Sequence, residues 1–407
     1  MSLESVFTRA WQQQSAWLWG LAPLSWFYGG LFKLNKFCHD CGIKAVYHAP
    51  VPVIVIGNIN VGGSGKTPFI IALIEYLHKL GLTIGVISRG YGGQVDKMPL
   101  LVTTDSSPDV VGDEPALIVR QTGVAMVVCP NRQQAIELLL EHHADIRLIL
   151  SDDGLQHHAL HRDAEWIVVD VVRGFGNRQL LPMGYLREPV SRLLDNVSID
   201  SAGMDNVGMG NAGIQTELLF HVTGLDGNLK YHITQLAPNL HALPYLSQTS
   251  PLANIPTMTL CTDNVISLSA WASHHAWETQ MNDDGQCLQA QGLQAQAVIA
   301  MTGIGYPKRF FNSLSKLGFS ITPVILPDHH QYVMTDFIKL NHLPKLPIII
   351  TTKDAIKIFT LFHHMTDDER QFWANWQQRI WVLPITADLS TAVYQRLHQQ
   401  LQALAIL

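Results

Sequence analysis

The chain has 407 residues, enough for two domains with substantial hydrophobic cores. Hydrophobic residues make up 47% and charged residues only 15%, a low share of charge that suggests contact with a membrane or a lipid. The net charge of -6 argues against a broad nucleic-acid-binding surface. The five scattered cysteines argue against a disulfide scaffold and fit a reducing cytoplasm. Cys38 and Cys41 form a C-x-x-C pair without a second pair at zinc spacing, which favours a structural or incidental role over a metal or redox site.

An uncharged, tryptophan-rich stretch, residues 16–32, lies between Arg9 and the two lysines Lys33 and Lys36. It contains a proline and three glycines and is shorter than a membrane-spanning helix, which needs roughly 20 apolar residues. The following CHDCGIK is a poor cleavage site for a secretory signal. Because Trp and Tyr favour the membrane–water boundary and lysines pair with anionic lipid, we expect residues 1–45 to be a membrane-associating segment with a hydrophobic helix. A buried helix of the protein core is the alternative.

From residue 50 the chain alternates apolar runs with amphipathic segments, the pattern of an α/β fold. Because the apolar runs lack polar alternation, they predict a parallel sheet covered by helices on both faces. We assign this domain to residues 46–215. Its predicted strands are 51–57, 82–88, 124–130, 146–153 and 165–172, and its predicted helices are 68–81, 113–123 and 131–143.

The second half of the chain predicts a smaller α/β domain within residues 216–407. Residues 198–214 are small and polar and predict a linker. The Gln-, Asn- and His-rich residues 225–296 have no clear period, so we assign them no structure. Beyond them the predicted strands are 297–305, 320–328, 346–354 and 379–385, with helices at 308–318 and from Thr391 onward.

Residues 57–68 (GNINVGGSGKTP) look like a phosphate-binding loop between a strand and a helix. In the pattern G-x-x-x-x-G-K-[ST], Asn60 stands in place of the first glycine, and asparagine tolerates the left-handed backbone better than other non-glycine residues. Backbone N–H groups of such a loop surround phosphate oxygens, while Lys66 would reach the β- and γ-phosphates and Thr67 would ligate Mg²⁺. An ordinary glycine-rich turn is the alternative. We assign nucleotide binding to Asn60, Val61, Gly62, Gly63, Ser64, Gly65, Lys66 and Thr67.

A magnesium–ATP site also needs an acidic residue at the end of another buried strand. The run IRLILSDD ends in Asp152 and Asp153, one of which would bind Mg²⁺ directly or through water. Paired aspartates at a strand end can also form a turn. Together with the phosphate-loop pattern, the pair predicts the magnesium side of a nucleotide site.

Four further stretches concentrate functional residue types beside predicted elements, where ligand loops of open α/β sheets gather. The carboxylates of VGDEP would serve equally well as N-terminal helix caps, so the local pattern leaves both interpretations open. The stretches are SRGYGG (88–93) with Arg89 and Tyr91, VGDEP (111–115) with Asp113 and Glu114, DDGLQHHALHRD (152–163) with Gln156 and His157, and LPMGYLREP (181–189) with Arg187 and Glu188.

In the second domain, LPDHHQ places Asp328, His329 and His330 directly after a predicted strand. An aspartate beside a histidine orients the ring and raises its basicity, as a general-base dyad requires. Further His pairs at 142–143, 157–158, 274–275 and 363–364 keep a metal-binding alternative open. They lack the i, i+4 spacing with carboxylates of metal sites, so we assign no ligands among them.

Eight motifs in this order over residues 57–357 together resemble the tetraacyldisaccharide 4'-kinase family of Gram-negative bacteria: GNINVGGSGKTP, SRGYGG, GDEP, DDGLQHHALHRD, PMGYLREP, GIGYPKRFF, PDHHQY and TTKDAIK. The resemblance implies a P-loop kinase core and a smaller domain, with the substrate entering the cleft between them. It implies transfer of the γ-phosphate of ATP, with Mg²⁺, to the 4'-hydroxyl of a tetraacyldisaccharide 1-phosphate in lipid A biosynthesis. The expected location is the cytoplasmic face of the inner membrane, peripheral or monotopic, with no nucleic acid and no obligate protein partner.

The same resemblance implies a role for individual residues. Asp113 matches the family's proposed catalytic base, and His329 matches the histidine that acts with that base across the cleft. His330 is the alternative, because the doublet makes the register ambiguous. Lys66 and Thr67 become the phosphate and Mg²⁺ residues, and Asp152 and Asp153 the magnesium-linked pair. The substrate-binding or supporting residues are then Glu114, Arg89, Tyr91, Gln156, His157, Arg187, Glu188, Asp328 and His330.

Three residues depart from the family pattern, none of them at a proposed catalytic position: Tyr306, Lys308 and Thr352, where Asn, Glu and Glu are usual.

Two alternative functions come from other functional classes. A nucleotide switch or metal-insertion GTPase would use the same loop, but such switches usually carry N-K-x-D, and here Asp354 follows Lys353 without a spacer. A non-enzymatic membrane-bound scaffold is the second, and loss of magnesium-dependent ATP binding in Lys66→Ala would exclude it.

Overall fold

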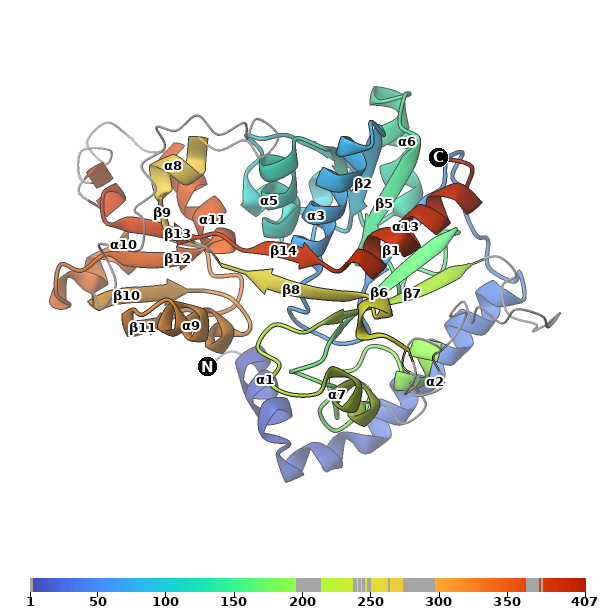
Figure 1. The fold of residues 1–407 in the computed structure, drawn as a ribbon, viewed down its shortest axis with the longest axis horizontal. Helices are drawn as coiled ribbons and strands as arrows, with labels where there is room; N and C mark the ends of the chain where they lie inside the picture. The colour runs from blue at the N-terminus through green and yellow to red at the C-terminus, as the bar shows by residue number, and fades with distance from the viewer. Residues whose placement is uncertain are drawn as a thin grey trace.

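The structure, a computed structural model, describes residues 3–194, 214–236, 250–262, 264–273, 297–363, 373–374 and 376–407 and the single residues 240, 243 and 246. Two sheets organise these residues and lie next to each other, the larger to the right and the smaller to the left (Figure 1). The predicted linker at 198–214 lies outside the described residues except for its last residue.

The large sheet has nine strands in the order β14-β8-β7-β6-β1-β5-β2-β4-β3. All neighbours from β8 to β4 run parallel, whereas the edge strands β14 and β3 run antiparallel. All five predicted strands are present. The sheet is nevertheless mixed rather than purely parallel, because the short edge strands β14 and β3 pair antiparallel with their neighbours. The bounds are β1 Val53–Gly57, β2 Ile84–Ser88, β3 Leu100–Val102, β4 Ala125–Val128, β5 Leu148–Asp152, β6 Ala164–Asp170, β7 Gln215–His221, β8 Thr257–Cys261 and β14 Thr386–Leu389.

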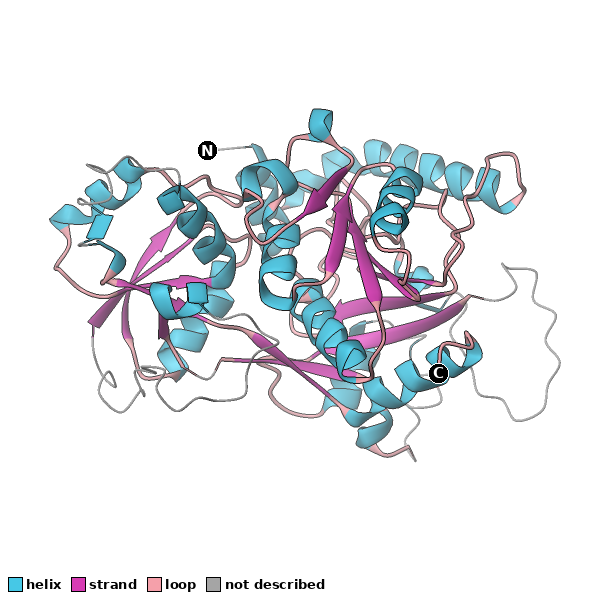
Figure 2. Ribbon diagram, turned by 90° about the horizontal axis from the view of Figure 1, so that it is seen from above, coloured by secondary structure: helices cyan, strands magenta, loops and turns pink. Residues whose placement is uncertain are grey.

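Helices cover both faces of this sheet, as the apolar strands predicted (Figure 2). Strand β1 shows why: Ile54 and Ile56 join one hydrophobic cluster and Val53 and Val55 the other, because successive side chains point to opposite faces. Helices α3, α5 and α13 contribute to the first cluster and α6 to the second. The bounds are α3 Lys66–Lys79, α4 Pro108–Val111, α5 Asp113–Thr122, α6 Arg132–His142 and α13 Thr391–Ala403.

The smaller sheet has five strands in the order β11-β10-β12-β13-β9, all neighbours parallel except the β13–β9 pair. Ile350 of β12 and Phe69 of α3 belong to the same hydrophobic cluster, so one core continues from one sheet to the other. The bounds are β9 Ile266–Ser267, β10 Ala297–Thr302, β11 Ser320–Ile325, β12 Ile348–Thr351, β13 Ile380–Leu383, α8 Leu268–Ser273, α9 Pro307–Lys316, α10 Met334–Ile338 and α11 Thr352–His363.

The two sheets divide the chain differently from the predicted boundary at 215/216. Strands β8 and β14, and all of β7 except its first residue, lie beyond that boundary but hydrogen-bond into the large sheet. Helix α13 also packs there, where Trp166 Nε1 donates to Gln400 Oε1 over 2.9 Å. The chain therefore leaves the large sheet, builds the smaller one and returns. Within residues 225–296, to which the sequence analysis assigned no structure, the described residues include β8, β9, α8 and α7 (Leu229–Leu236).

The N-terminal segment consists of α1 (Leu3–Gln13), a 3₁₀ helix (Ala16–Leu21) and α2 (Ala22–Asp40), drawn in blue along the lower edge of Figure 1. The uncharged stretch 16–32 does not form the single hydrophobic helix that the sequence predicted, because it divides into the 3₁₀ helix and the first half of α2, whose second half carries polar residues. No helix among the described residues is long and apolar enough to cross a membrane.

One face of α2 packs against the protein and the other is open. Ser25 Oγ donates to Leu180 O over 3.0 Å and accepts from Met183 N over 2.9 Å, and a Cβ on Gly29 would lie 2.9 Å from Leu180 Cδ1. On the open face, Trp26 and Phe27 keep 74% and 66% of their surface exposed. The alternative of a helix buried in the core is therefore wrong for this face.

Candidate active site

The loop predicted to bind phosphate lies between the end of β1 and the start of α3, the position expected from the sequence. Gly62 and Gly65 take the left-handed backbone, with φ of 96° and 95°. A Cβ on Gly65 would lie 2.8 Å from Met258 Cε, so a side chain there would be both strained and crowded. The loop backbone thus depends on glycine at two positions.

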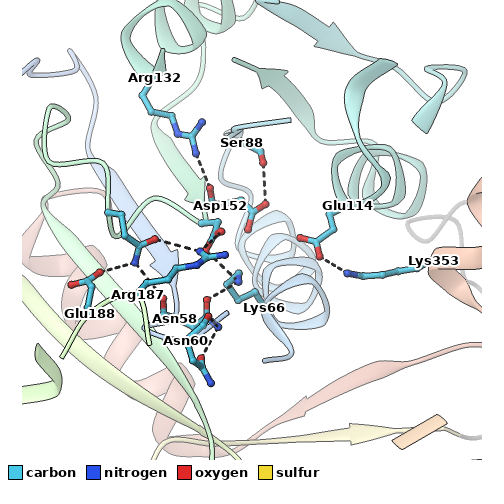
Figure 3. A network of polar contacts seen from close by, with 12 residues as sticks. Asn58, Asn60, Lys66, Ser88, Glu114, Arg132, Asp152, Arg187, Glu188 and Lys353 are labelled. Carbon is cyan, nitrogen blue, oxygen red and sulfur yellow. Dashed lines mark hydrogen bonds and ion pairs between the residues drawn. The ribbon is translucent and has the colours of Figure 1, made fainter. Parts of the chain in front are cut away.

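Asn60 plays a different part from the one expected of it. It is absent from the left-handed residues of the described chain, so its tolerance of that conformation does not explain its presence. Its side chain is buried, and Asn58 Nδ2 donates to both its carbonyl oxygen and its Oδ1 over 2.8 Å. Asn58 Oδ1 in turn accepts from Lys66 Nζ over 2.8 Å. The two asparagines therefore hold the loop and its lysine from beneath (Figure 3).

The acidic pair stands at the end of β5, where Asp152 is the last residue of the strand and Asp153 the next, close to this lysine. Asp153 Oδ1 lies 3.2 Å from Lys66 Nζ, and its Oδ2 lies 2.7 Å from Arg187 Nη1. Burial acts to raise the pKa of Asp153, but these two cations hold that pKa well below the ordinary value. Asp152 differs, because burial and the neighbouring Glu114 and Asp153 charges raise its pKa to about 7. The two aspartates are thus electrostatically distinct.

Asp113 and His329 contact each other across the site, although Asp113 lies on a helix of the large sheet and His329 on a loop of the smaller sheet. Asp113 opens α5, and His329 follows β11 with a left-handed backbone, φ 54°. His329 Nδ1 donates to Asp113 Oδ2 over 3.0 Å, and this hydrogen bond raises the pKa of His329. His330 instead contacts Asp336, with Nε2 2.7 Å from Oδ2. In this structure the histidine beside Asp113 is therefore His329.

Two lysines of α11 complete this side of the site. Lys353 forms an ion pair with Glu114 (Figure 3), and Lys357 Nζ lies 2.7 Å from Asp113 Oδ2. Burial acts to raise the pKa of Asp113, but the hydrogen bond from His329 and the charge of Lys357 keep it below its ordinary value. Asp113 is therefore ionised at neutral pH.

A single cavity of about 730 Å³ gathers these groups between the two sheets. The sequence-predicted residues that line it are Val61, Gly62, Gly63, Ser64, Gly65, Lys66, Thr67, Arg89, Tyr91, Asp113, Glu114, Asp152, Asp153, Gln156, His157, Arg187, Asp328 and His329. Asn60, Glu188 and His330 are not among its lining residues. Glu188 is fully buried and accepts a 2.6 Å hydrogen bond from Gln156, so it supports a residue of the wall.

Several residues of the site were not predicted from the sequence. Arg132 at the start of α6 donates to Asp152 O over 3.2 Å, and Ser88 Oγ donates to Asp152 Oδ2 over 3.1 Å (Figure 3). Ser88 ends β2 and Arg132 follows β4, its parallel neighbour, so both lie at the carboxyl ends of strands, a position that points to a ligand site. Arg309 lines the same cavity from α9. Tyr28 of α2 also lines it and donates to Arg187 O over 2.9 Å, a contact that no local pattern signals.

Among the described residues, no group of three or more His, Cys, Asp and Glu side chains is arranged to hold a metal ion. The His pairs at 274–275 and 363–364 have no described side chains. Cys38 and Cys41 are free cysteines.

Comparisons with known proteins identify the family of the chain. A family model described as tetraacyldisaccharide-1-P 4'-kinase matches residues 17–213 and 248–402. The tetraacyldisaccharide 4'-kinase of Psychrobacter cryohalolentis is 45% identical, with 100% of this chain and 98% of the relative covered. That of Psychrobacter arcticus is 44% identical, with 100% and 97% covered.

A solved structure supports the fold. The crystal structure of the "apo" form of LpxK from Aquifex aeolicus in complex with ATP has a TM-score of 0.63 at 22% identity, covering 95% of this chain and 99% of that one. At this identity the likeness concerns the fold alone. On the family model and the two relatives, the chain belongs to the tetraacyldisaccharide 4'-kinase family.

Proposed function

We infer that the protein is an ATP-dependent kinase that transfers the γ-phosphate to the 4'-hydroxyl of a tetraacyldisaccharide 1-phosphate in lipid A biosynthesis. Family membership supports the substrate. The observation that carries the chemistry is that one cavity brings together Lys66 of the phosphate loop, Asp152 of the acidic pair and the Asp113–His329 pair. A nucleotide switch or a scaffold has no use for a carboxylate–histidine pair facing its phosphate loop.

The loop and its lysine would hold the nucleotide. Backbone N–H groups at the start of α3 would donate to phosphate oxygens, with the helix dipole adding positive potential. Lys66 is already oriented by Asn58 and Asp153, at 2.8 and 3.2 Å. An oriented cation loses little freedom when phosphate arrives, which favours stabilisation of the charge that develops during transfer.

We propose that Thr67, Asp152 and Asp153 would hold Mg²⁺. Carboxylate and hydroxyl oxygens suit this hard cation, which keeps water and phosphate oxygens as its other ligands. The fit rests on Asp152, whose Oδ1 is buried without a hydrogen-bond partner. Asp153, whose oxygens contact Lys66 and Arg187, would bind Mg²⁺ through water. When bound, Mg²⁺ would neutralise negative charge on the β- and γ-phosphates.

Asp113 would act as the general base. It would accept the proton of the 4'-hydroxyl as that oxygen bonds to the γ-phosphorus and the bond to the β–γ bridging oxygen breaks, leaving ADP. His329, whose hydrogen bond fixes one Asp113 oxygen, would orient the carboxylate. The remaining cavity-lining residues, among them Arg89, Tyr91 and Arg187, would position nucleotide and disaccharide.

We propose that the protein works at the cytoplasmic face of the inner membrane and that residues 1–45 attach it there. The support is the open face of α2, with the exposed Lys33 beside it for anionic lipid. Because Tyr28 of the same helix lines the cavity, a lipid held by α2 would lie next to the site. The exposed apolar residues of the face are Leu24, Trp26, Phe27, Leu31, Leu34 and Phe37.

Functionally, residues 46–215 would hold the nucleotide, and residues of 216–407 would complete the substrate cleft.

The test is transfer of radiolabel from [γ-³²P]ATP to a tetraacyldisaccharide 1-phosphate in detergent, compared with water as the only acceptor. We expect labelled lipid from the wild-type protein and at least about a 100-fold loss in Asp113→Asn, given the usual contribution of a general base. Asp145→Asn, an exposed aspartate outside the cavity, is the matched control. Nucleotide hydrolysis without lipid labelling would favour the GTPase alternative, and neither reaction would favour the scaffold.

A further inference from the structure

The motif TTKDAIK is part of the family resemblance, yet none of its residues has a role in the mechanism above. Its second lysine, Lys357, is the residue that contacts Asp113. We propose that Lys357 is a positioning residue for phosphoryl transfer, which fixes the Asp113 carboxylate so that one of its oxygens stays free for the acceptor hydroxyl. This inference rests on the proposed function, because it takes Asp113 to be the base.

The geometry is specific. Lys357 Nζ lies 2.7 Å from Asp113 Oδ2, and the Lys357 side chain is only 7% exposed. One turn earlier on α11, Lys353 pairs with Glu114, the residue after Asp113. Residues four apart on a helix share a face, so α11 presents both lysines to the first turn of α5. The packing of α11 against α5 therefore fixes the position of the Asp113 carboxylate.

Lys357 and His329 divide the Asp113 carboxylate unequally. Both contact Oδ2, at 2.7 and 3.0 Å, and none of the described side chains hydrogen-bonds Oδ1. Lys357 Nζ also donates to His330 O over 3.3 Å, which ties the loop carrying His329 to the same ammonium. One buried cation thus orients the carboxylate and restrains its histidine partner.

The first turn of α11 is itself held firmly. Asp354 is fully buried and accepts hydrogen bonds from Thr302 Oγ1 and Gly303 N at the end of β10, at 2.8 and 3.0 Å. It also accepts from Tyr332 Oη over 2.7 Å, just beyond the histidine loop. Because these bonds join the strand end, the loop and the helix, Lys357 extends from a rigid support rather than from a mobile one.

The positive charge of Lys357 helps to keep the buried Asp113 carboxylate ionised. The charged groups that act on Asp113 are His329 on the loop after β11 and Lys353 and Lys357 on α11. Without the Lys357 ammonium, this largely buried carboxylate would keep only His329 and the more distant charge of Lys353 to offset its burial. Its pKa would rise, so a larger fraction of the base would be protonated as the pH falls.

The decisive variant is Lys357→Met, which keeps the length of the side chain and removes its charge. We expect kcat to fall by about 10- to 100-fold, part of what a general base contributes. We expect KM for ATP to change less than about twofold, because Lys357 contacts Asp113 and His330 rather than residues of the phosphate loop. The acidic limb of the kcat/KM profile moves to higher pH by about one unit, and Lys357→Arg restores the wild-type limb. Lys316→Met, an exposed lysine of α9, should match the wild type.

The outcomes separate this inference from the function itself. If Asp113→Asn is inactive while Lys357→Met keeps the wild-type kcat and pH profile, the role of Lys357 is refuted and the kinase assignment stands. If Asp113→Asn transfers phosphate normally, the base assignment itself is wrong. A loss of activity without movement of the acidic limb would make Lys357 merely structural and overturn the inference. Lys357→Gln, measured in parallel, keeps a donor for the carboxylate and replaces the Met variant if that one fails to fold.

Discussion

Arg309 of α9 donates a 2.7 Å hydrogen bond from Nη2 to Oδ2 of Asp170, a buried carboxylate at the end of β6. This ion pair joins the smaller sheet's helix to the large sheet. His221 lies 3.8 Å from the same carboxylate, and its Nδ1 donates to Ser64 O of the phosphate loop over 2.9 Å. The contact between the two sheets on this side is therefore one residue removed from the phosphate loop.

We predict that Arg309→Met lowers kcat by about tenfold, because domain contacts that complete a site commonly limit turnover. It also leaves Asp170 buried without its cation, which destabilises the fold. The double variant Asp170→Asn/Arg309→Met removes that buried charge, so it should recover thermal stability but not kcat. Steady-state kinetics and thermal unfolding measure both effects, with the exposed neighbour Lys308→Met as control. An unchanged kcat in Arg309→Met would refute a role for this pair in turnover.

Lys66→Met should abolish most of the activity. The variant loses the cation that faces the phosphates and leaves Asp153 with Arg187 alone, so we expect turnover to fall by at least about 100-fold and ATP affinity to weaken. Calorimetric ATP titration with magnesium, together with the lipid-labelling assay, measures both. Lys79→Met, at the exposed end of the same helix, is the control. Full ATP affinity and turnover in Lys66→Met would contradict the phosphate-loop assignment.

The open face of α2 should govern membrane attachment. Trp26→Gln/Phe27→Gln removes two side chains that are 74% and 66% exposed, so the fold should keep its unfolding temperature. Sedimentation with vesicles containing anionic lipid should show binding weakened by at least about tenfold, since each large apolar side chain contributes kilocalories when buried. Ile325→Gln changes an apolar residue that is 62% exposed on β11 and should bind as the wild type does. Equal sedimentation of all three proteins would exclude this face as the attachment site.

His221 should make the protein sensitive to acid. Burial lowers the pKa of this fully buried histidine from 6.5 to about 4, so between these values the unfolded chain binds a proton that the folded chain does not. Stability from neutral His221 is thus fully present above pH 6.5 and is lost as the pH falls toward 4, at about 1.4 kcal/mol per pH unit.

Urea unfolding at pH 7 and pH 5 tests this sign. We expect His221→Gln, which keeps a donor for Ser64 O but does not titrate, to lose about 2 kcal/mol less than the wild type between the two pH values. His157 and His158, whose pKa values are lowered by burial to about 4 and about 3, are present in both proteins and cancel in the comparison. Identical losses in the two proteins would refute the assignment to His221.

Much of the fold was predictable because local pattern and burial agree in it. The apolar runs that form β1, β2, β4, β5 and β6 are buried on both faces, so their local sequence predicts a strand without knowledge of the neighbouring strands. The antiparallel edges and the return of the chain through β14 were not predictable, because short strands are chosen by the edge they pair with. Asn60 was misjudged for a similar reason, since its role depends on its contact with Asn58 rather than on its own backbone preference.

By itself, the sequence determined the α/β class, the phosphate loop and the residues of the acidic and histidine motifs, because each of these is encoded within a few consecutive residues. Only the tertiary structure decided which histidine meets Asp113, that Lys357 joins them, and that Tyr28 of the N-terminal segment reaches the same cavity. The physical reason is that these contacts span hundreds of residues of chain. Their geometry depends on how two sheets pack against each other, which no local pattern specifies.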